Sequence, residues 1–175
     1  MKFWIIIGVA LLLSLGSLPG KEASMKLVSS AFGNGQPVPL LYSCEGKDYS
    51  PDLAWNDIPP GTRSLALTCV DPDAPVGDWI HWVVWNIPVG LKSLPARVDP
   101  QDQTRFAQGT NSWGRTGYGG PCPPPGHGVH HYNFTLYALD LDQINLDPGA
   151  RIGDLRSIME GHILEEVTLT GTYER

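Results

Sequence analysis

The stretch SLALTCVDPDAPVGDWIHWVVWNI, residues 64–87, consists of two mostly apolar runs on either side of a turn. The runs 64–70 and 79–87 have the composition of strands. The turn between them has two prolines and a glycine, which interrupt regular structure. Both alternating sets of the second run are largely apolar, so that run is expected to be central in a sheet. The stretch therefore predicts two neighbouring strands in a β-rich domain.

Two further segments continue this pattern toward the C-terminus. Residues 131–139 and 167–173 are rich in β-branched and aromatic residues and are bounded by turn clusters. The sixteen prolines and twenty glycines fall between such short segments rather than within them. This distribution favours a mainly β fold.

One helix and one long loop are expected between and after these strands. Asp154 can cap a helix in which Leu155, Ile158, Met159 and Ile163 recur at three-to-four spacing. Residues 107–128 are too rich in glycine and proline for a strand or helix. Loops of that length in compact domains are usually functional.

The N-terminus has the layout of a secretory signal. Lys2 precedes an apolar run, residues 3–13, which small and turn-forming residues end by Gly20. The run is shorter than the roughly 20 residues that a membrane-spanning helix needs. We therefore expect a signal peptide at residues 1–20, with cleavage between 16 and 24, and one domain at 25–175. The mature protein is expected to be periplasmic or secreted and not membrane-spanning.

Charge and cysteine content narrow the possible partners and the redox state. The net charge of −6, with no basic cluster, argues against a nucleic-acid partner. The three cysteines of an exported chain permit one disulfide. Cys69 lies in an apolar run and is expected to be buried. Cys44 and Cys122 are then the candidate pair.

The turn after residue 70 presents two carboxylates close to a histidine. Prolines fix the backbone of Asp71-Pro72-Asp73-Ala74-Pro75, so Asp71 and Asp73 project from a stiff turn. Strand alternation places His81 on one face with Trp79 and Val83. Each has a purely structural alternative, because Asp often caps turn amides and a lone strand histidine is more often a core residue.

A second histidine follows a glycine- and proline-rich segment. Residues 117–125 form a stiff wall whose glycine amides are expected to be free. His130 and Tyr132 then point to one face of the following strand. Free amides beside imidazoles suit an oxyanion, and a neighbouring carboxylate favours a cationic His81 or His130.

Several separated motifs, in order, resemble one known family, the phosphatidylethanolamine-binding proteins, in its bacterial Raf-kinase-inhibitor-like branch. Asp71–Pro75, Trp79–Trp82 and Gly120–Tyr132 are similar to the family's two signatures. The resemblance extends through shorter motifs at residues 42–46, 50–55, 111–114 and 169–173. It covers nearly all of the expected mature chain.

The resemblance implies a large, mostly antiparallel central sheet, a second small sheet and one or two short helices. It also implies a shallow pocket for phosphate, acetate or a phospholipid headgroup, without a cofactor. A protein partner such as a kinase or protease is a further implication, although the inserts of the eukaryotic members have no counterpart here. Carried over by position, the ligand-binding residues are Asp71, Asp73, Trp79, His81, Gly120, Pro121, His130 and Tyr132.

Three other functions are weighed beside this binding module. A hydrolase could use the Asp, His and Tyr residues, but no Gly-x-Ser-x-Gly turn supplies a nucleophile. A metal site could use His127, His130 and His131 with Asp71 and Asp73, but the adjacent strand residues His130 and His131 face opposite ways. An inhibitor that acts through a protein partner is expected to expose a contiguous patch around Tyr118 and His127.

Overall fold

The computed structural model describes residues 24–175. The expected signal peptide, residues 1–20, lies outside the described residues. No helix within 24–175 is long and apolar enough to cross a membrane.

Two sheets and one short α-helix make up the regular structure of residues 24–175. The larger sheet has the strand order β2-β9-β8-β4-β5-β7, in which β2 runs parallel to β9 and the other neighbours are antiparallel. Its strands are β2 (Gln36–Pro37), β4 (Ser64–Asp71), β5 (Trp79–Ile87), β7 (Ala107–Gln108), β8 (His130–Leu139) and β9 (Ile163–Tyr173). The smaller sheet consists of β1 (Lys26–Val28), β3 (Leu53–Asn56) and β6 (Ser93–Leu94).

A 3₁₀ turn, η1 (Leu40–Tyr42), and the helix α1 (Ile152–Met159) complete the fold. The mainly β fold with a large sheet, a small sheet and short helices, as expected from the sequence, is confirmed. The four expected strands correspond to β4, β5, β8 and β9.

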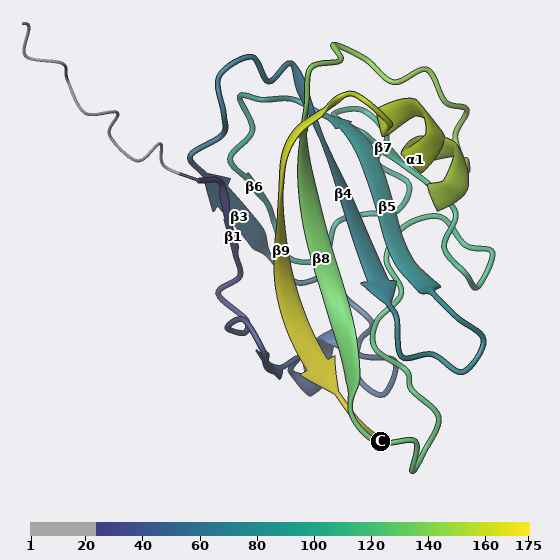
Figure 1. The fold of residues 1–175 in the computed structure, drawn as a ribbon. Helices are drawn as coiled ribbons and strands as arrows, with labels where there is room; N and C mark the ends of the chain where they lie inside the picture. Colours follow the sequence, from purple (N-terminus) through teal and green to yellow (C-terminus); the bar gives the residue numbers. More distant parts are fainter. Residues whose placement is uncertain (1–23) are drawn as a thin grey trace, which may run out of the picture.

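Apolar side chains cover both faces of the larger sheet. One cluster, which includes Trp82 and Phe134, joins this sheet to the smaller sheet through Trp55. The other cluster includes Trp85 and packs against Leu155 and Met159 of α1. Figure 1 shows α1 beside β5, with β1 and β3 at the opposite side of the molecule. Because both faces of β4 and β5 are buried, these strands are held rigidly up to their ends.

The helix begins earlier than the sequence pattern indicates. Arg151, not Asp154, occupies the cap position, and its backbone N–H donates to Asp154 Oδ2 at 2.8 Å. Asp154 therefore closes the first turn from within it, where a carboxylate also favours the helix dipole. Gly161 at φ 79° follows the helix, and Ile163 is the first residue of β9 rather than part of the helix.

A β-bulge interrupts the pairing of β4 with β5. Val70 lies opposite Ile80 and Cys69 lies opposite Trp82, which leaves His81 as an extra residue in β5. The bulge shifts the alternation of side chains between the two faces at that position. It lies directly before the end of β4, where the candidate site is found.

Gly171 of β9 marks a close approach of the chain over the larger sheet. A Cβ atom there would lie 2.4 Å from Val38 Cγ2 and 2.9 Å from Phe32 Cε2. We predict that Gly171→Ala lowers the free energy of unfolding by about 1–3 kcal/mol, because the added methyl overpacks the core. Chemical denaturation measures this. Gly153→Ala in α1 is the control, since no atom lies within 4 Å of its Cβ position; equal stability of the two variants would contradict the prediction.

Candidate functional site

A pocket of about 230 Å³ opens at the end of the larger sheet where β4 ends and β5 and β8 begin. The strands contribute its more polar side, and the loops that follow them contribute its apolar side. Its lining residues are Asp71, Ala74, Pro75, Val76, Trp79, His81, Trp113, Cys122, Pro123, Pro124 and His130. The pocket is therefore built from two stretches of the chain, residues 71–81 and residues 113–130.

The bulge in β5 brings His81 to this pocket. Ile80 and Val83 both lie in the cluster under α1, so regular alternation is broken between them. The His81 ring packs edge-on against Tyr132 of β8, with ring centroids 5.0 Å apart. The expectation that His81 shares a face with Val83 is wrong, because the bulge turns His81 toward the face that carries Tyr132.

His81 is held as a neutral ring with one unused nitrogen. Its Nδ1 lies 2.6 Å from the carbonyl oxygen of Gly119, so Nδ1 carries the hydrogen and donates it. Its Nε2 is buried and has no hydrogen-bond partner among the described residues. Burial lowers the pKa of His81 to about 4, against the opposing effects of the bond to Gly119 and of Asp71. The expectation that His81 or His130 is cationic near neutral pH therefore does not hold for His81.

Asp71 and His130 form a buried pair across the pocket floor. His130 Nδ1 lies 2.7 Å from Asp71 Oδ2, and the exposed fractions of the two side chains are 2% and 4%. The other oxygen of Asp71 accepts the backbone N–H of Asp73 at 2.8 Å. Asp71 thus caps the turn with one carboxylate oxygen and orients His130 with the other.

His127 extends this pair to the surface. His127 Nδ1 lies 2.9 Å from His130 Nε2, and His127 itself is exposed. From the sequence, His127 is considered only as an alternative metal ligand and as part of an exposed patch, and its contact with His130 is not expected. The glycines on either side, Gly126 and Gly128, both have positive φ and allow the tight turn that brings it back onto His130.

Tyr132 provides a second buried polar atom without a partner. Its hydroxyl has no partner at hydrogen-bond distance among the described residues. Its side chain is fully buried behind His81, next to the residues that line the pocket rather than among them. Burial, followed by the charge of Asp71 and by the interaction of the hydroxyl with that carboxylate, raises the pKa of Tyr132, whose hydroxyl therefore stays protonated. A buried polar group left unpaired costs about 1–3 kcal/mol, so two of them side by side indicate a missing partner.

The glycine amides of the expected oxyanion cradle are already occupied. Gly119 N–H donates to the carbonyl of His81 at 2.9 Å, and Gly120 N–H donates to Asp48 Oδ1 at 2.6 Å. The expectation of free amides here is wrong, because the loop uses them to fix itself to β5 and to residues 43–48. Neither Gly120 nor Pro121 lines the pocket. Pro123 and Pro124 form that wall instead.

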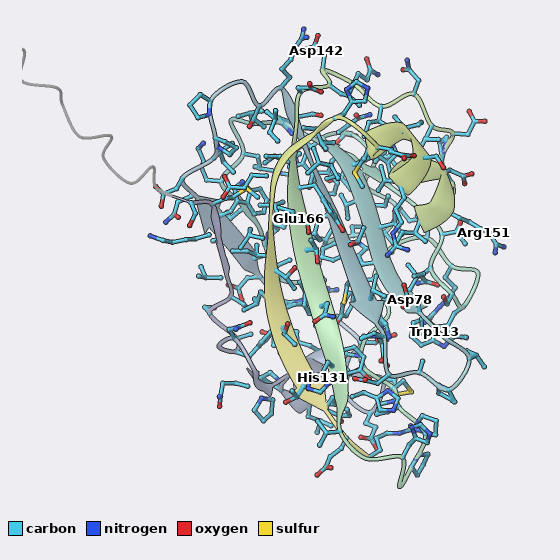
Figure 2. The ribbon with its side chains drawn as sticks, viewed as in Figure 1. Asp78, Trp113, His131, Asp142, Arg151 and Glu166 are labelled. Atoms are coloured by element: carbon cyan, nitrogen blue, oxygen red, sulfur yellow. A yellow bond between two sulfur atoms is a disulfide. The ribbon has the colours of Figure 1, made fainter. Side chains whose placement is uncertain are left out.

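Asp73 lies outside the pocket and pairs with a different histidine. Its Oδ2 accepts both the backbone N–H of His131, at 2.8 Å, and His131 Nδ1, at 2.7 Å. Figure 2 shows His131 near the start of β8, and both side chains are exposed. Across residues 24–175, no three His, Cys, Asp or Glu side chains are grouped to hold a metal ion.

Two apolar residues at the mouth of the pocket were missed by sequence reasoning. Val76 is 75% exposed and Trp113 is 37% exposed, although both line the pocket. Trp113 packs edge-on against Trp79 and His81 and lies on a loop near Asp78 (Figure 2). Trp113 belongs to one of the motifs that carry the family resemblance, and that was the available signal.

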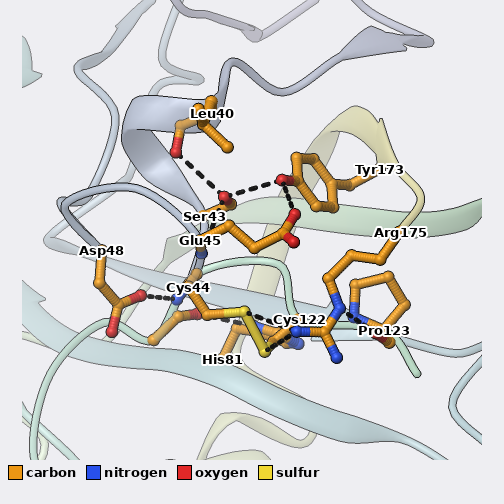
Figure 3. Close-up of a disulfide and its surroundings, with 12 residues drawn as sticks. Leu40, Ser43, Cys44, Glu45, Asp48, His81, Cys122, Pro123, Tyr173 and Arg175 are labelled. Atoms are coloured by element: carbon orange, nitrogen blue, oxygen red, sulfur yellow. Dashed lines mark hydrogen bonds between the residues drawn. A yellow bond between two sulfur atoms is a disulfide. The ribbon is translucent and has the colours of Figure 1, made fainter. Parts of the chain in front are cut away.

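A disulfide between Cys44 and Cys122 fixes the proline wall of the pocket. It connects that wall to the segment after η1, and the backbone N–H of Cys44 donates to the carbonyl of Pro121. Figure 3 shows Arg175 across the disulfide, with its Nε donating to the carbonyl of Pro123 at 2.7 Å. Cys69 is a free, buried cysteine, as expected.

A comparison with protein-family models matches residues 28–174 to the phosphatidylethanolamine-binding protein model. The chain belongs to this family. The match covers nearly all of the described residues, and it includes every residue of the pocket.

Relatives and solved structures of the family agree with this assignment. A UPF0098 protein of Pyrococcus horikoshii is 43% identical over 98% of this chain and 88% of its own length. The structure of Escherichia coli YbcL, described as a member of the mammalian PEBP family, aligns with a TM-score of 0.82 at 33% identity, over 87% of this chain and 99% of YbcL. A PEBP homologue of Chlamydia trachomatis aligns with a TM-score of 0.79 at 38% identity, over 87% and 98% of the two chains.

Reduction of the disulfide is expected to destabilise the protein. Cys44 and Cys122 are separated by 78 residues, and a cross-link that closes a loop of this length stabilises by about 4 kcal/mol in the chain-entropy model. We predict a loss of that order in the free energy of unfolding for Cys44→Ser/Cys122→Ser, measured by chemical denaturation. Addition of a thiol reductant should lower the free energy of unfolding of the wild-type protein and leave that of the double variant unchanged.

The low pKa of His81 makes stability depend on pH. Unfolded His81 takes up a proton below its ordinary pKa of 6.5, whereas the folded protein does so only near pH 4. The contribution is therefore complete above pH 6.5 and is lost as the pH falls toward 4, by up to about 3 kcal/mol. We predict a shallower loss of stability over this range for His81→Gln than for wild type or for His162→Gln. Parallel curves for all three proteins would contradict this.

Proposed function

We propose that the pocket binds a small oxyanionic group, such as a phosphoryl or carboxylate headgroup. The observation that carries the proposal is the pair of buried, unpartnered atoms, His81 Nε2 and Tyr132 Oη, beside the Asp71–His130 pair. A ligand oxygen or hydroxyl in the pocket would supply their missing hydrogen bonds. Membership of the phosphatidylethanolamine-binding family supports anion binding in general.

The size of the pocket limits what enters it. Its volume of about 230 Å³ is below the range of roughly 300–1,000 Å³ that is usual for small-molecule sites. At about −1.5 kcal/mol for each non-hydrogen atom, a five-atom phosphate gains at most roughly −7.5 kcal/mol, which corresponds to micromolar binding. A natural ligand therefore needs contacts outside the pocket, and the exposed Val76 and Trp113 are positioned to make them.

We propose binding without turnover. Both ring nitrogens of His130 are engaged, Nδ1 by Asp71 and Nε2 by His127, so neither is available as a base to a substrate. No Ser or Thr of residues 24–175 lines the pocket, and the sulfur of Cys122, its one cysteine, is in the disulfide. These contacts support a binding protein over a hydrolase that uses a covalent intermediate.

A protein partner is the second candidate, and the pocket mouth favours it. The expected exposed patch around Tyr118 and His127 is wrong for Tyr118, whose ring packs between Trp82 and Phe134 in the core, whereas His127 is exposed. Val76 and Trp113 are instead the exposed apolar residues next to the pocket. A loop of a kinase, protease or other partner that carries an acidic or phosphorylated side chain could bind there, with the anion in the pocket and apolar neighbours on this rim.

We also propose that the protein is exported. The apolar run at residues 3–13 is typical of a signal peptide, and the Cys44–Cys122 disulfide is stable in oxidising compartments. Both features support a periplasmic or secreted location. Fractionation of cells that express the full chain tests this, and recovery of uncleaved, reduced protein in the cytosol would overturn it.

Calorimetric titration of the purified protein with phosphate and with phosphoethanolamine tests the pocket. We expect micromolar to millimolar binding that weakens about tenfold in Tyr132→Phe, because one buried hydrogen bond to the anion is lost. Tyr118→Phe is the matched control, since its hydroxyl donates to the carbonyl of Tyr42, outside the pocket lining. Absence of binding for both ligands to the folded wild-type protein would overturn the proposed function.

A further inference from the structure

The neutral ring of His81 determines what kind of hydrogen-bonding group can complete the site. Because Nδ1–H is donated to the carbonyl of Gly119, Nε2 has a lone pair and no hydrogen. Nε2 is buried and unpartnered. The missing partner of Nε2 is therefore a donor, whereas a fully deprotonated anion offers only acceptors.

The charged and titratable groups around His81 do not reverse this preference. They are Asp71 at the end of β4, Asp48 from the segment after η1, and His130 and Tyr132 at the start of β8. The two carboxylates favour protonation of His81, yet burial outweighs them and leaves the ring neutral at pH 7. The lining contains no Lys or Arg that could bind a deprotonated oxyanion instead.

We propose that this pocket selects oxyacids that keep a proton, with the ligand P–OH donating to His81 Nε2 and the Tyr132 hydroxyl donating to a ligand oxygen. This inference rests on the proposed function and specifies its ligand class. Inorganic phosphate and phosphomonoesters in the monoanionic form fit this description. Sulfate and phosphodiesters do not, because they carry no acidic proton near neutral pH.

The cost of charging the ring explains why the proton should come from the ligand. At pH 7 the imidazolium of His81 is disfavoured about 1,000-fold, from the difference between 7 and a pKa of about 4. A ligand hydroxyl makes the same hydrogen bond with no charge on the ring. A site with a buried acceptor also rejects an analogue that lacks the matching hydrogen, because the acceptor is left unpaired.

The test compares phosphate with sulfate, which has nearly the same size and shape. In calorimetric titrations of wild-type protein at pH 6.5, we expect phosphate to bind about 10- to 100-fold more tightly than sulfate. Phosphoethanolamine should bind more tightly than glycerophosphoethanolamine, the diester headgroup of the corresponding lipid. The affinity for phosphoethanolamine should also fall about tenfold for each pH unit well above its second pKa near 6.

Two variants assign the selectivity to His81. His81→Asn retains a side-chain amide that can donate toward Gly119 but has no equivalent of Nε2, so the phosphate-to-sulfate ratio should fall toward one. Tyr132→Phe should weaken both anions and keep the ratio, because a hydroxyl donor serves either ligand. Thermal melts check that each variant is folded. If a variant does not fold, the phosphate-to-sulfate affinity ratio of the wild-type protein still tests the selectivity.

The outcomes separate this inference from the proposed function. If sulfate, or the diester, binds wild-type protein as tightly as its protonated counterpart, the anion pocket stands and the selectivity for a P–OH group is wrong. If phosphate and phosphoethanolamine both fail to bind the folded wild-type protein, the proposed function and this inference are both wrong. A ratio that is unchanged in His81→Asn also overturns the role of Nε2.

Discussion

The hydrogen bond between His130 Nδ1 and Asp71 Oδ2 joins the last residue of β4 to the first residue of β8. Both side chains are buried, and an ionisable group in that position is tolerated only when it is paired. The pair fixes the point at which both strands end and the loops around the pocket begin. The turn after β4 starts from the other oxygen of Asp71, so the orientation of this carboxylate also positions Val76 and the rest of that wall.

The site was only partly predictable, because its geometry depends on how separate segments pair with one another. Composition and turn residues located β4, β5, β8 and β9, because short apolar runs bounded by prolines and glycines are typical of β-strands. Strand alternation failed at His81, since a bulge depends on how two strands pair and leaves no mark in one strand's own sequence. The motif resemblance nevertheless placed Asp71, His81, His130 and Tyr132 together. A motif shared with a family locates a residue in the fold even when the local backbone geometry, such as the bulge, is not predicted.

The wall of the pocket shows a second limit of reasoning from sequence. A glycine-rich loop suggests free amides, but those of Gly119 and Gly120 are used within the loop. Buried backbone groups are nearly always paired, so a loop in contact with the core satisfies its own amides first. What remains for a ligand is then a few side-chain atoms, here on His81 and Tyr132. These atoms can be recognised only when every neighbouring hydrogen bond is known.

The proposed anion pocket lies in a protein of net charge −6, which would disfavour binding if binding depended on charge alone. Exposed charges more than about 8–10 Å away are largely screened at physiological ionic strength, so the acidic surface matters less than the groups in the wall. Those groups include one carboxylate and no Lys or Arg side chain. Recognition must then come from directed hydrogen bonds in an enclosed, partly apolar site, where each bond is stronger than in water. Such a site distinguishes ligands by where their protons are, whereas a site built from Lys and Arg would distinguish them mainly by charge.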